Sequence, residues 1–265
     1  MSEPDGSLRT RRRSAPTKSS PARLMYRDGR ESDADQTIEA RESQMQPTST
    51  STDRTLDRRR RLSLSAGPLG LLFERPMPEG AEDLASGYAN LDASNVIYVS
   101  TPITTGPELL RWLRANPGAS GALRAHARDE VISRNITAVV PLVALVRSRF
   151  RDAAIIDPTA LEDVQGWTQT DYHRFWSEII IRYVDGVVFA DGWQYSVGCT
   201  VEYAAATLLG LPAYNARLER LTAQAGIELL QSTESDLDAV GASKTMQVSA
   251  VTTLARLAYS VRVAG

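Results

Sequence analysis

Short, continuously apolar runs alternate with helical segments along this chain, and the alternation constrains its fold more than any other feature. The runs are NVIYVS (95–100), DAAIIDP (152–158), VDGVVFA (184–190) and LPAYNA (211–216). Strands without polar alternation are typical of a parallel sheet that helices cover on both faces. The sequence therefore predicts an α/β fold, a three-layer sandwich of the flavodoxin or Rossmann type with a parallel sheet.

Helical spacing of apolar residues fills the intervals between these runs. Pro141 marks a kink or boundary in one predicted helix, Thr170 can cap the next, and Gly210 is well placed to end the one after it. We expect helices over about 107–115, 122–150, 170–183, 201–209, 217–231 and 244–261.

The beginning of the chain has a different composition. Up to Ser65 it carries 14 Lys and Arg against 10 Asp and Glu, a balance of +4, whereas the remainder has 16 against 22, or −6. Rich in Ser, Thr, Pro and Arg, it has too little apolar surface to offset its ordering entropy. We expect 1–65 to be a disordered basic tail, 66–92 a partly ordered lead-in and 93–265 the α/β domain. The run DRRRRLS could touch nucleic acid, although a solvated tail is the simpler interpretation.

Cysteine, histidine and apolar content exclude several classes of protein. A single cysteine, Cys199, excludes an internal disulfide and a multi-cysteine metal site, and His126 and His173 are far apart in the sequence. No run approaches the roughly 20 apolar residues of a membrane span. We therefore expect a soluble, cytoplasmic protein without a metal.

Ligands of parallel sheets bind beyond the carboxyl ends of the strands. The loop TPITTG (101–106) follows the first strand, Asp157 ends the second, and DGWQYSVG (191–198) follows the third. These segments should meet at one rim of the sheet.

The last of these loops leads into a helix with an unusual start. Ser196 is a favoured N-cap, and Gly198 lets a ligand approach the first amides of the helix. Glu202 follows one turn later, so its carboxylate should project over Gly198. A charged side chain in a helix that packs mostly against the sheet is not needed to keep the protein soluble. It could act as nucleophile or electrostatic partner for a centre that becomes positive, such as a sugar C1.

Three segments together resemble the nucleoside 2-deoxyribosyltransferase-like superfamily: YVSTPITTG (98–106), VDGVVFADGW (184–193) and SVGCTVEYAAATLLGLP (196–212). The resemblance covers roughly residues 95–215, and the spacing Ser-x-Gly-x-x-x-Glu is its most specific part. It is most similar to the branch with a Gly-Trp-x-x-Ser-x-Gly core. The resemblance implies a flavodoxin-like fold and a glutamate that attacks C1 of a nucleoside or nucleotide. The base is released, and the sugar passes to water or another base.

Matched position by position, the resemblance implies that Glu202 is the nucleophile, with Tyr98 near it, and that Ser196 holds a 5′-phosphate or sugar hydroxyl. The family also uses a second carboxylate to protonate the leaving base. Glu178 is nearest in spacing and is favoured, whereas Asp171 has the right residue type two turns earlier. Further substrate-binding candidates lie in the rim loops: Thr101, Thr104, Gly106, Asp191, Trp193 and Gly198.

The predicted activity is cleavage or exchange of the N-glycosidic bond of a nucleoside or its 5′-monophosphate, without a metal or redox cofactor. Two alternatives stay open. One is a phosphoribohydrolase, because GCTVE (198–202) is distantly similar to that group's glycine-rich motif. The other is a nucleotide-binding or scaffolding protein without catalysis. The apolar AVTTLARLAYSV (250–261) also predicts a homo-oligomer.

Overall fold

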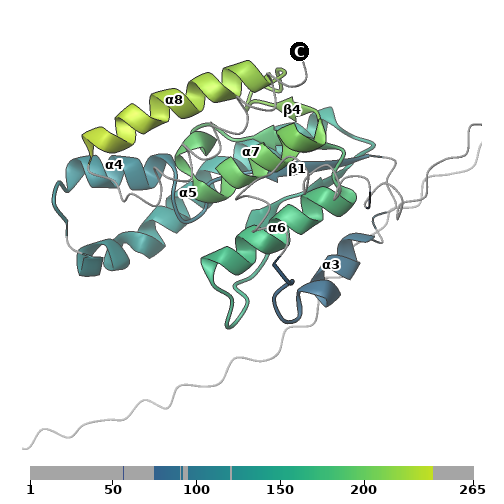
Figure 1. The fold of residues 1–265 in the computed structure, drawn as a ribbon, viewed down its shortest axis with the longest axis horizontal. Coiled ribbons are helices and arrows are strands. Elements are labelled where there is room, and N and C mark those ends of the chain that lie inside the picture. The colour runs from purple at the N-terminus through teal and green to yellow at the C-terminus, as the bar shows by residue number, and fades with distance from the viewer. Residues whose placement is uncertain (1–55, 57–74, 90, 92–94, 120, 241–265) are drawn as a thin grey trace, which may run out of the picture. The chain divides into compact units, whose positions relative to one another are not determined.

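The computed structural model describes residues 56, 75–89, 91, 95–119 and 121–240. Its centre is a parallel sheet of four strands in the order β2-β1-β3-β4 (Figure 1). This order belongs to the flavodoxin-like arrangement, so the predicted fold class is confirmed. The strands are β1 (Val96–Ser100), β2 (Ala154–Ile156), β3 (Gly186–Phe189) and β4 (Ala213–Tyr214). The predicted tail, apart from Leu56, and the helix expected over 244–261 lie outside the described residues.

Helices connect the strands and flank the sheet. Each crossover between parallel strands contains at least one helix. Figure 1 shows α3 beside α6. It shows α8 near α4 and α7. The helices are α3 (Ala81–Ala89), α4 (Pro107–Ala115), α5 (Gly121–Arg149), α6 (Gln169–Tyr183), α7 (Val197–Leu209) and α8 (Ala223–Ala239), with short 3-10 helices η1 (Pro158–Ala160) and η2 (Trp193–Tyr195).

Alternate side chains of β1 enter two separate cores. Ile97 and Val99 pack with the apolar side of α5, including Val143. Tyr98 faces the opposite side, where buried residues of α6 and α7 such as Phe175 surround it. The two-residue period of a strand produces this division, so both faces of the sheet are covered as the apolar strands predicted.

The helix expected over 122–150 is present as α5, and it continues through Pro141, which is exposed, so the proline is not a helix boundary. Several other boundaries differ from the sequence prediction: α7 begins at Val197 and not near 201, and α8 ends at Ala239 and not near 231. The N-cap of α6 is Thr168, not Thr170: the Asp171 carboxylate accepts hydrogen bonds from the Thr168 amide (2.7 Å) and hydroxyl (2.6 Å).

A further difference concerns the start of α8, which lies at Ala223 and not near 217. The Asn215 side chain accepts hydrogen bonds from the amides of Arg217 and Glu219 and closes a turn there. Thr222 then caps α8 by accepting from the Ala225 amide at 3.2 Å. Local side-chain capping thus outweighs helical spacing in this segment.

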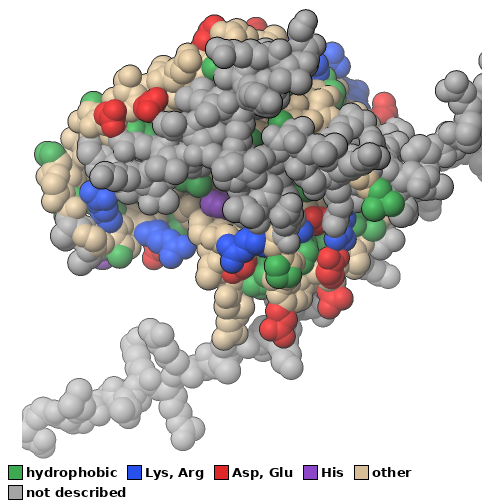
Figure 2. Space-filling model, in the orientation of Figure 1, with side chains coloured by type: hydrophobic (Ala, Val, Ile, Leu, Met, Phe, Trp, Pro, Cys, Tyr) green, Lys and Arg blue, Asp and Glu red, His purple; other side chains and the backbone are tan. Residues whose placement is uncertain are grey.

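One described helix, α5, is long and apolar enough to cross a membrane by length and composition. Part of it is buried in the core against the sheet, and core helices of soluble proteins pass the same test. This is therefore weak evidence for a membrane span, and cytoplasmic location stays a prediction. In Figure 2 basic and acidic side chains are interspersed on the visible described surface.

Candidate functional site

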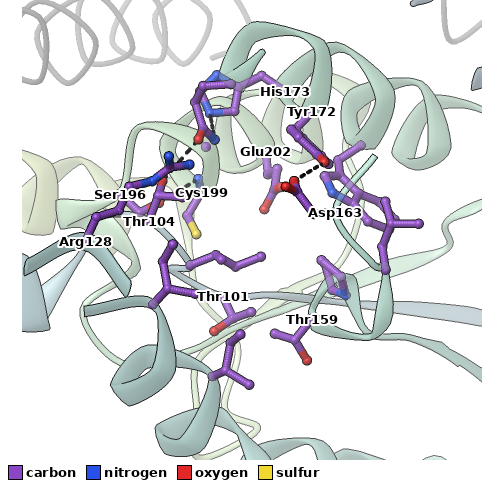
Figure 3. Close-up of a pocket in the computed structure, with 18 of the residues that line it drawn as sticks. Thr101, Thr104, Arg128, Thr159, Asp163, Tyr172, His173, Ser196, Cys199 and Glu202 are labelled. Atoms are coloured by element: carbon purple, nitrogen blue, oxygen red, sulfur yellow. Dashed lines mark hydrogen bonds between the residues drawn. The ribbon is translucent and has the colours of Figure 1, made fainter. Parts of the chain in front are cut away.

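A cavity of about 390 Å³ lies beyond the carboxyl ends of the strands, and Figure 3 shows the side chains around it. The loops after β1, β2 and β3 all contribute to its wall, through Thr101, Thr159 and Ser196. The loops after these strands therefore meet at one edge of the sheet, as predicted. The volume of the cavity is in the range of small-molecule sites.

Glu202 is the buried carboxylate of this cavity, with 8% of the residue exposed. Its Oε1 accepts a hydrogen bond from the Tyr98 hydroxyl at 2.7 Å, and its Oε2 accepts one from Ser100 Oγ at 2.6 Å. Burial raises the pKa of Glu202 to about 6, while both hydrogen bonds favour the ionised form and act in the opposite direction. The group is thus an anion near neutral pH, and its hydrogen-bond partners among the described residues include no cation.

The strand β1 supplies both hydroxyls. Tyr98 and Ser100 are two residues apart, so they project from the same face of the sheet toward α7. Tyr98 is fully buried beside Trp176, with ring centroids 5.8 Å apart. Burial, and secondly the charge of Glu202, raise the pKa of Tyr98, so the phenol remains a proton-bearing donor. Ser100 was not predicted, although its spacing from Tyr98 could have indicated it.

The start of α7 has the predicted cap and an unpredicted neighbour. Ser196 is the N-cap and accepts from the Cys199 amide at 3.4 Å. A Cβ on Gly198 would lie 3.2 Å from His173 Nε2, so the imidazole occupies the space that the glycine leaves. The Glu202 carboxylate is hydrogen-bonded to β1, and the side chains nearest the open position at Gly198 are those of His173 and Ser196, not the expected Glu202. Cys199 is a packed side chain, and burial raises the pKa of its thiol.

Polar side chains continue from His173 along the wall of the cavity. Gln169 Nε2 lies 3.1 Å from His173 Nε2, and Gln169 Oε1 accepts from the Thr104 hydroxyl at 3.2 Å. Burial lowers the pKa of His173 to about 4, so the imidazole is neutral at physiological pH. The histidine can therefore exchange hydrogen bonds with a ligand but carries no charge.

Gly106 takes part in a contact between two rim loops and does not line the cavity. Its amide donates to the Tyr195 carbonyl at 3.2 Å, and its φ of 92° favours glycine. Gly192, also at positive φ, lies so close to Pro107 that a Cβ would be 2.1 Å from Cγ. These contacts fix the loop that carries Ser196 against the loop after β1.

Two further predicted binding residues also lie away from the cavity wall. Trp193 is buried, with its ring against Phe189 (5.1 Å between centroids) and Tyr203 (4.5 Å). Asp191 is exposed in the same loop. The structure thus gives the tryptophan a place in the core, while Thr101, Thr104, Ser196 and Gly198 do line the cavity.

Glu178 is not brought to the cavity. It is 1% exposed and accepts hydrogen bonds from Arg174 Nη1 at 2.7 Å and Arg182 Nε at 2.5 Å. Arg182 also pairs with Glu82 of α3. The side chain therefore belongs to an ion-pair network that connects α6 to the segment before the sheet. Asp171, the alternative, caps α6, and the two hydrogen bonds from Thr168 lower its pKa.

Several cavity residues were not singled out in the sequence. Arg128 and Asp129 come from α5, whose 29 residues span about 43 Å at 1.5 Å per residue. A five-residue strand such as β1 is only about 17 Å long, so part of α5 must extend beyond the sheet. The difference in length between α5 and the strand could therefore have predicted that part of α5 reaches the cavity. Asp163 instead lies on a loop whose path only the tertiary structure defines, whereas Tyr172 is in the first turn of the predicted helix α6.

No protein-family model, no curated protein and no solved structure matches the chain. Within the described ranges, no group of three or more His, Cys, Asp and Glu side chains is arranged to hold a metal ion. The fold and the site define an α/β protein of flavodoxin-like topology with a buried carboxylate, hydrogen-bonded to two hydroxyls, at the carboxyl edge of its sheet.

Proposed function

We propose that the protein cleaves or exchanges the N-glycosidic bond of a nucleoside or nucleoside 5′-monophosphate. The observation that carries the proposal is the environment of Glu202. Its carboxylate lines the cavity, is largely buried, and contacts two neutral hydroxyls. An oriented anion in such a site can approach an electrophilic sugar carbon, and among the described residues no cation is hydrogen-bonded to it.

In this reaction one Glu202 oxygen forms a bond to C1 of the sugar while the C1–N bond breaks. The base leaves with the bonding electron pair and takes up a proton from solvent water. A water molecule, or the nitrogen of a second base, then attacks C1, releases the carboxylate and loses a proton. Tyr98 and Ser100 hold the carboxylate in place through both steps, because each donates to a different oxygen. Both are positioning residues.

The test is a chromatographic screen of purified protein with ribonucleosides, deoxyribonucleosides and their 5′-monophosphates, with and without an acceptor base. Glu202→Gln is the matched variant, since it removes the negative charge and keeps the shape. Glu162→Gln, an exposed glutamate that does not line the cavity, is the control. We expect free base from wild type and Glu162→Gln, and none from Glu202→Gln. Equal release by all three proteins would refute a role for Glu202.

A second candidate function is nucleotide binding without catalysis. It is favoured by the position of Glu178, which two arginines hold away from the cavity where a leaving-group acid would be needed. Calorimetric binding of a nucleotide without base release in the screen would support it. Preference for ribonucleoside monophosphates with water as acceptor would instead indicate the phosphoribohydrolase variant of the proposal.

The homo-oligomer stays a prediction, because residues 250–261 lie outside the described part of the chain. Light scattering at micromolar concentration measures it directly. A mass of about 29 kDa, that of one chain, would contradict it.

A further inference from the structure

Besides Glu202, two carboxylates line the cavity: Asp129 of α5 and Asp163, which lies on the loop between η1 and α6. The Tyr172 hydroxyl donates to Asp163 Oδ1 at 2.7 Å and accepts from the Val164 amide at 2.7 Å. The Tyr172 ring packs edge-on against Trp167, with centroids 5.1 Å apart. Asp163 is exposed, yet this chain of contacts gives its carboxylate a fixed place on the cavity wall.

Asp163 retains accepting capacity in this position. Tyr172 is its hydrogen-bond partner among the described residues, and it occupies one site on Oδ1. An ionised carboxylate has about four acceptor sites on two oxygens and can accept two parallel N–H bonds. Asp163 can therefore receive a ligand edge that carries two donors side by side.

The position of Asp163 relative to Glu202 indicates which part of a ligand would reach it. Figure 3 shows Ser196, Thr104 and Arg128 on one side of Glu202 and Asp163 with Tyr172 on the other. A sugar whose C1 lies at Glu202 and whose hydroxyls face the first group directs its base toward the second. Apolar side chains suited to a flat ring also line the cavity: Ile132, Ile136, Pro158 and Leu161.

We propose that Asp163, oriented by Tyr172, selects a leaving base with two adjacent N–H donors, as guanine presents at N1 and its 2-amino group. Adenine and cytosine place a ring nitrogen acceptor beside the amino group, and this lone pair would face the carboxylate. Uracil, thymine and hypoxanthine offer a single N–H on that edge. This inference rests on the proposed glycosidic activity and specifies its substrate class.

The experiment compares guanosine with inosine, which lacks only the 2-amino group, as nucleosides, deoxynucleosides and 5′-monophosphates. It measures kcat/KM for base release, and calorimetric Kd for guanine and hypoxanthine. The proteins are wild type, Asp163→Asn, Glu202→Gln and the control Glu162→Gln. We expect a wild-type preference for the guanine member of about tenfold to a hundredfold, the range of a bidentate contact to a base edge. The preference should disappear in Asp163→Asn and persist in Glu162→Gln.

The outcomes separate this inference from the proposed function. Equal kcat/KM for guanosine and inosine, or a preference that persists in Asp163→Asn, overturns the inference while the glycosidic activity stands. Absence of base release, with tighter guanine binding that Asp163→Asn removes, refutes the activity and supports the base recognition. Glu202→Gln should release no base but still bind guanine more tightly than hypoxanthine. Failure of every protein to bind either base overturns the inference.

Discussion

Two buried glutamates on neighbouring helices of the same side of the sheet differ in their partners. Glu202 on α7 accepts hydrogen bonds from two neutral hydroxyls and faces the cavity, whereas Glu178 on α6 is held by Arg174 and Arg182. Spacing in the sequence made both of them candidates for catalysis. The comparison teaches that the charge of the partners, more than burial, distinguishes a carboxylate that is available to a ligand from one that connects elements of the fold.

The largest expected effect is on activity. Glu202→Gln should lower kcat/KM for base release by at least about 10³-fold, because in the proposed reaction this group bonds to the reacting carbon. Glu178→Gln should lower it by less than about tenfold under conditions where the variant is folded. Steady-state kinetics checks both. Comparable losses in the two variants would abolish the distinction between the glutamates.

The next effect is on stability, and here the replacement of Glu178 lowers the free energy of unfolding although it has little effect on activity. Glu178→Gln should lower the free energy of unfolding by about 3 kcal/mol, because Arg174 stays buried without its carboxylate partner. Urea unfolding followed by circular dichroism measures the change. Glu82→Gln, which removes the exposed partner of Arg182, is the control and should cost less than about 1 kcal/mol. A stability of Glu178→Gln equal to wild type would contradict the network's role.

The pH dependence of Glu202 gives a third contrast. Its folded-state pKa of about 6 lies above the ordinary value of 4.5, so between these values the folded protein binds more protons than the unfolded chain. Stability therefore falls as the pH rises through this window, by about 2 kcal/mol. Glu202→Gln should be more stable than wild type by this amount at pH 7 and equal to it near pH 4, as thermal unfolding at both pH values can show. In wild type, kcat/KM should rise through about pH 6 as the nucleophile ionises.

The smallest expected effect comes from the hydroxyls. Ser100→Ala and Tyr98→Phe each remove one hydrogen bond to the ionised carboxylate, so the pKa of Glu202 should rise further. The midpoint of the pH–rate profile should then move to higher pH in both variants, with activity at pH 8 reduced by less than about tenfold. An unchanged midpoint would show that these donors do not favour the anion.

The sequence predicted the parts of the fold that depend on local patterns. The apolar strands, the α4 interval and the caps at Ser196 and Gly210 are local, and they agree with the structure. Capping was less predictable where two threonines compete: Thr168 is the N-cap of α6 because Asp171 lies three residues after it, a pattern also present in the sequence.

The candidate site was only partly predictable. Glu202, Tyr98 and Ser196 follow from a motif and from strand ends. Glu178 lies at a distance along the chain that suits the second carboxylate of the resembled family. Its place beside two arginines, however, depends on the directions of the side chains of α6. Asp163 reaches the cavity through the course of a loop, which no periodicity encodes.

Alternate residues of β1 face opposite sides of the sheet, and this has a consequence for how the gene can change. Tyr98 and Ser100 face Glu202, while Ile97 and Val99 face the helix on the other side of the sheet. Inserting one codon within this strand would exchange the two sets for every residue beyond the insertion. A carboxylate would then meet aliphatic side chains, and hydroxyls would enter an apolar core. This segment should therefore tolerate substitutions far better than single-residue insertions or deletions.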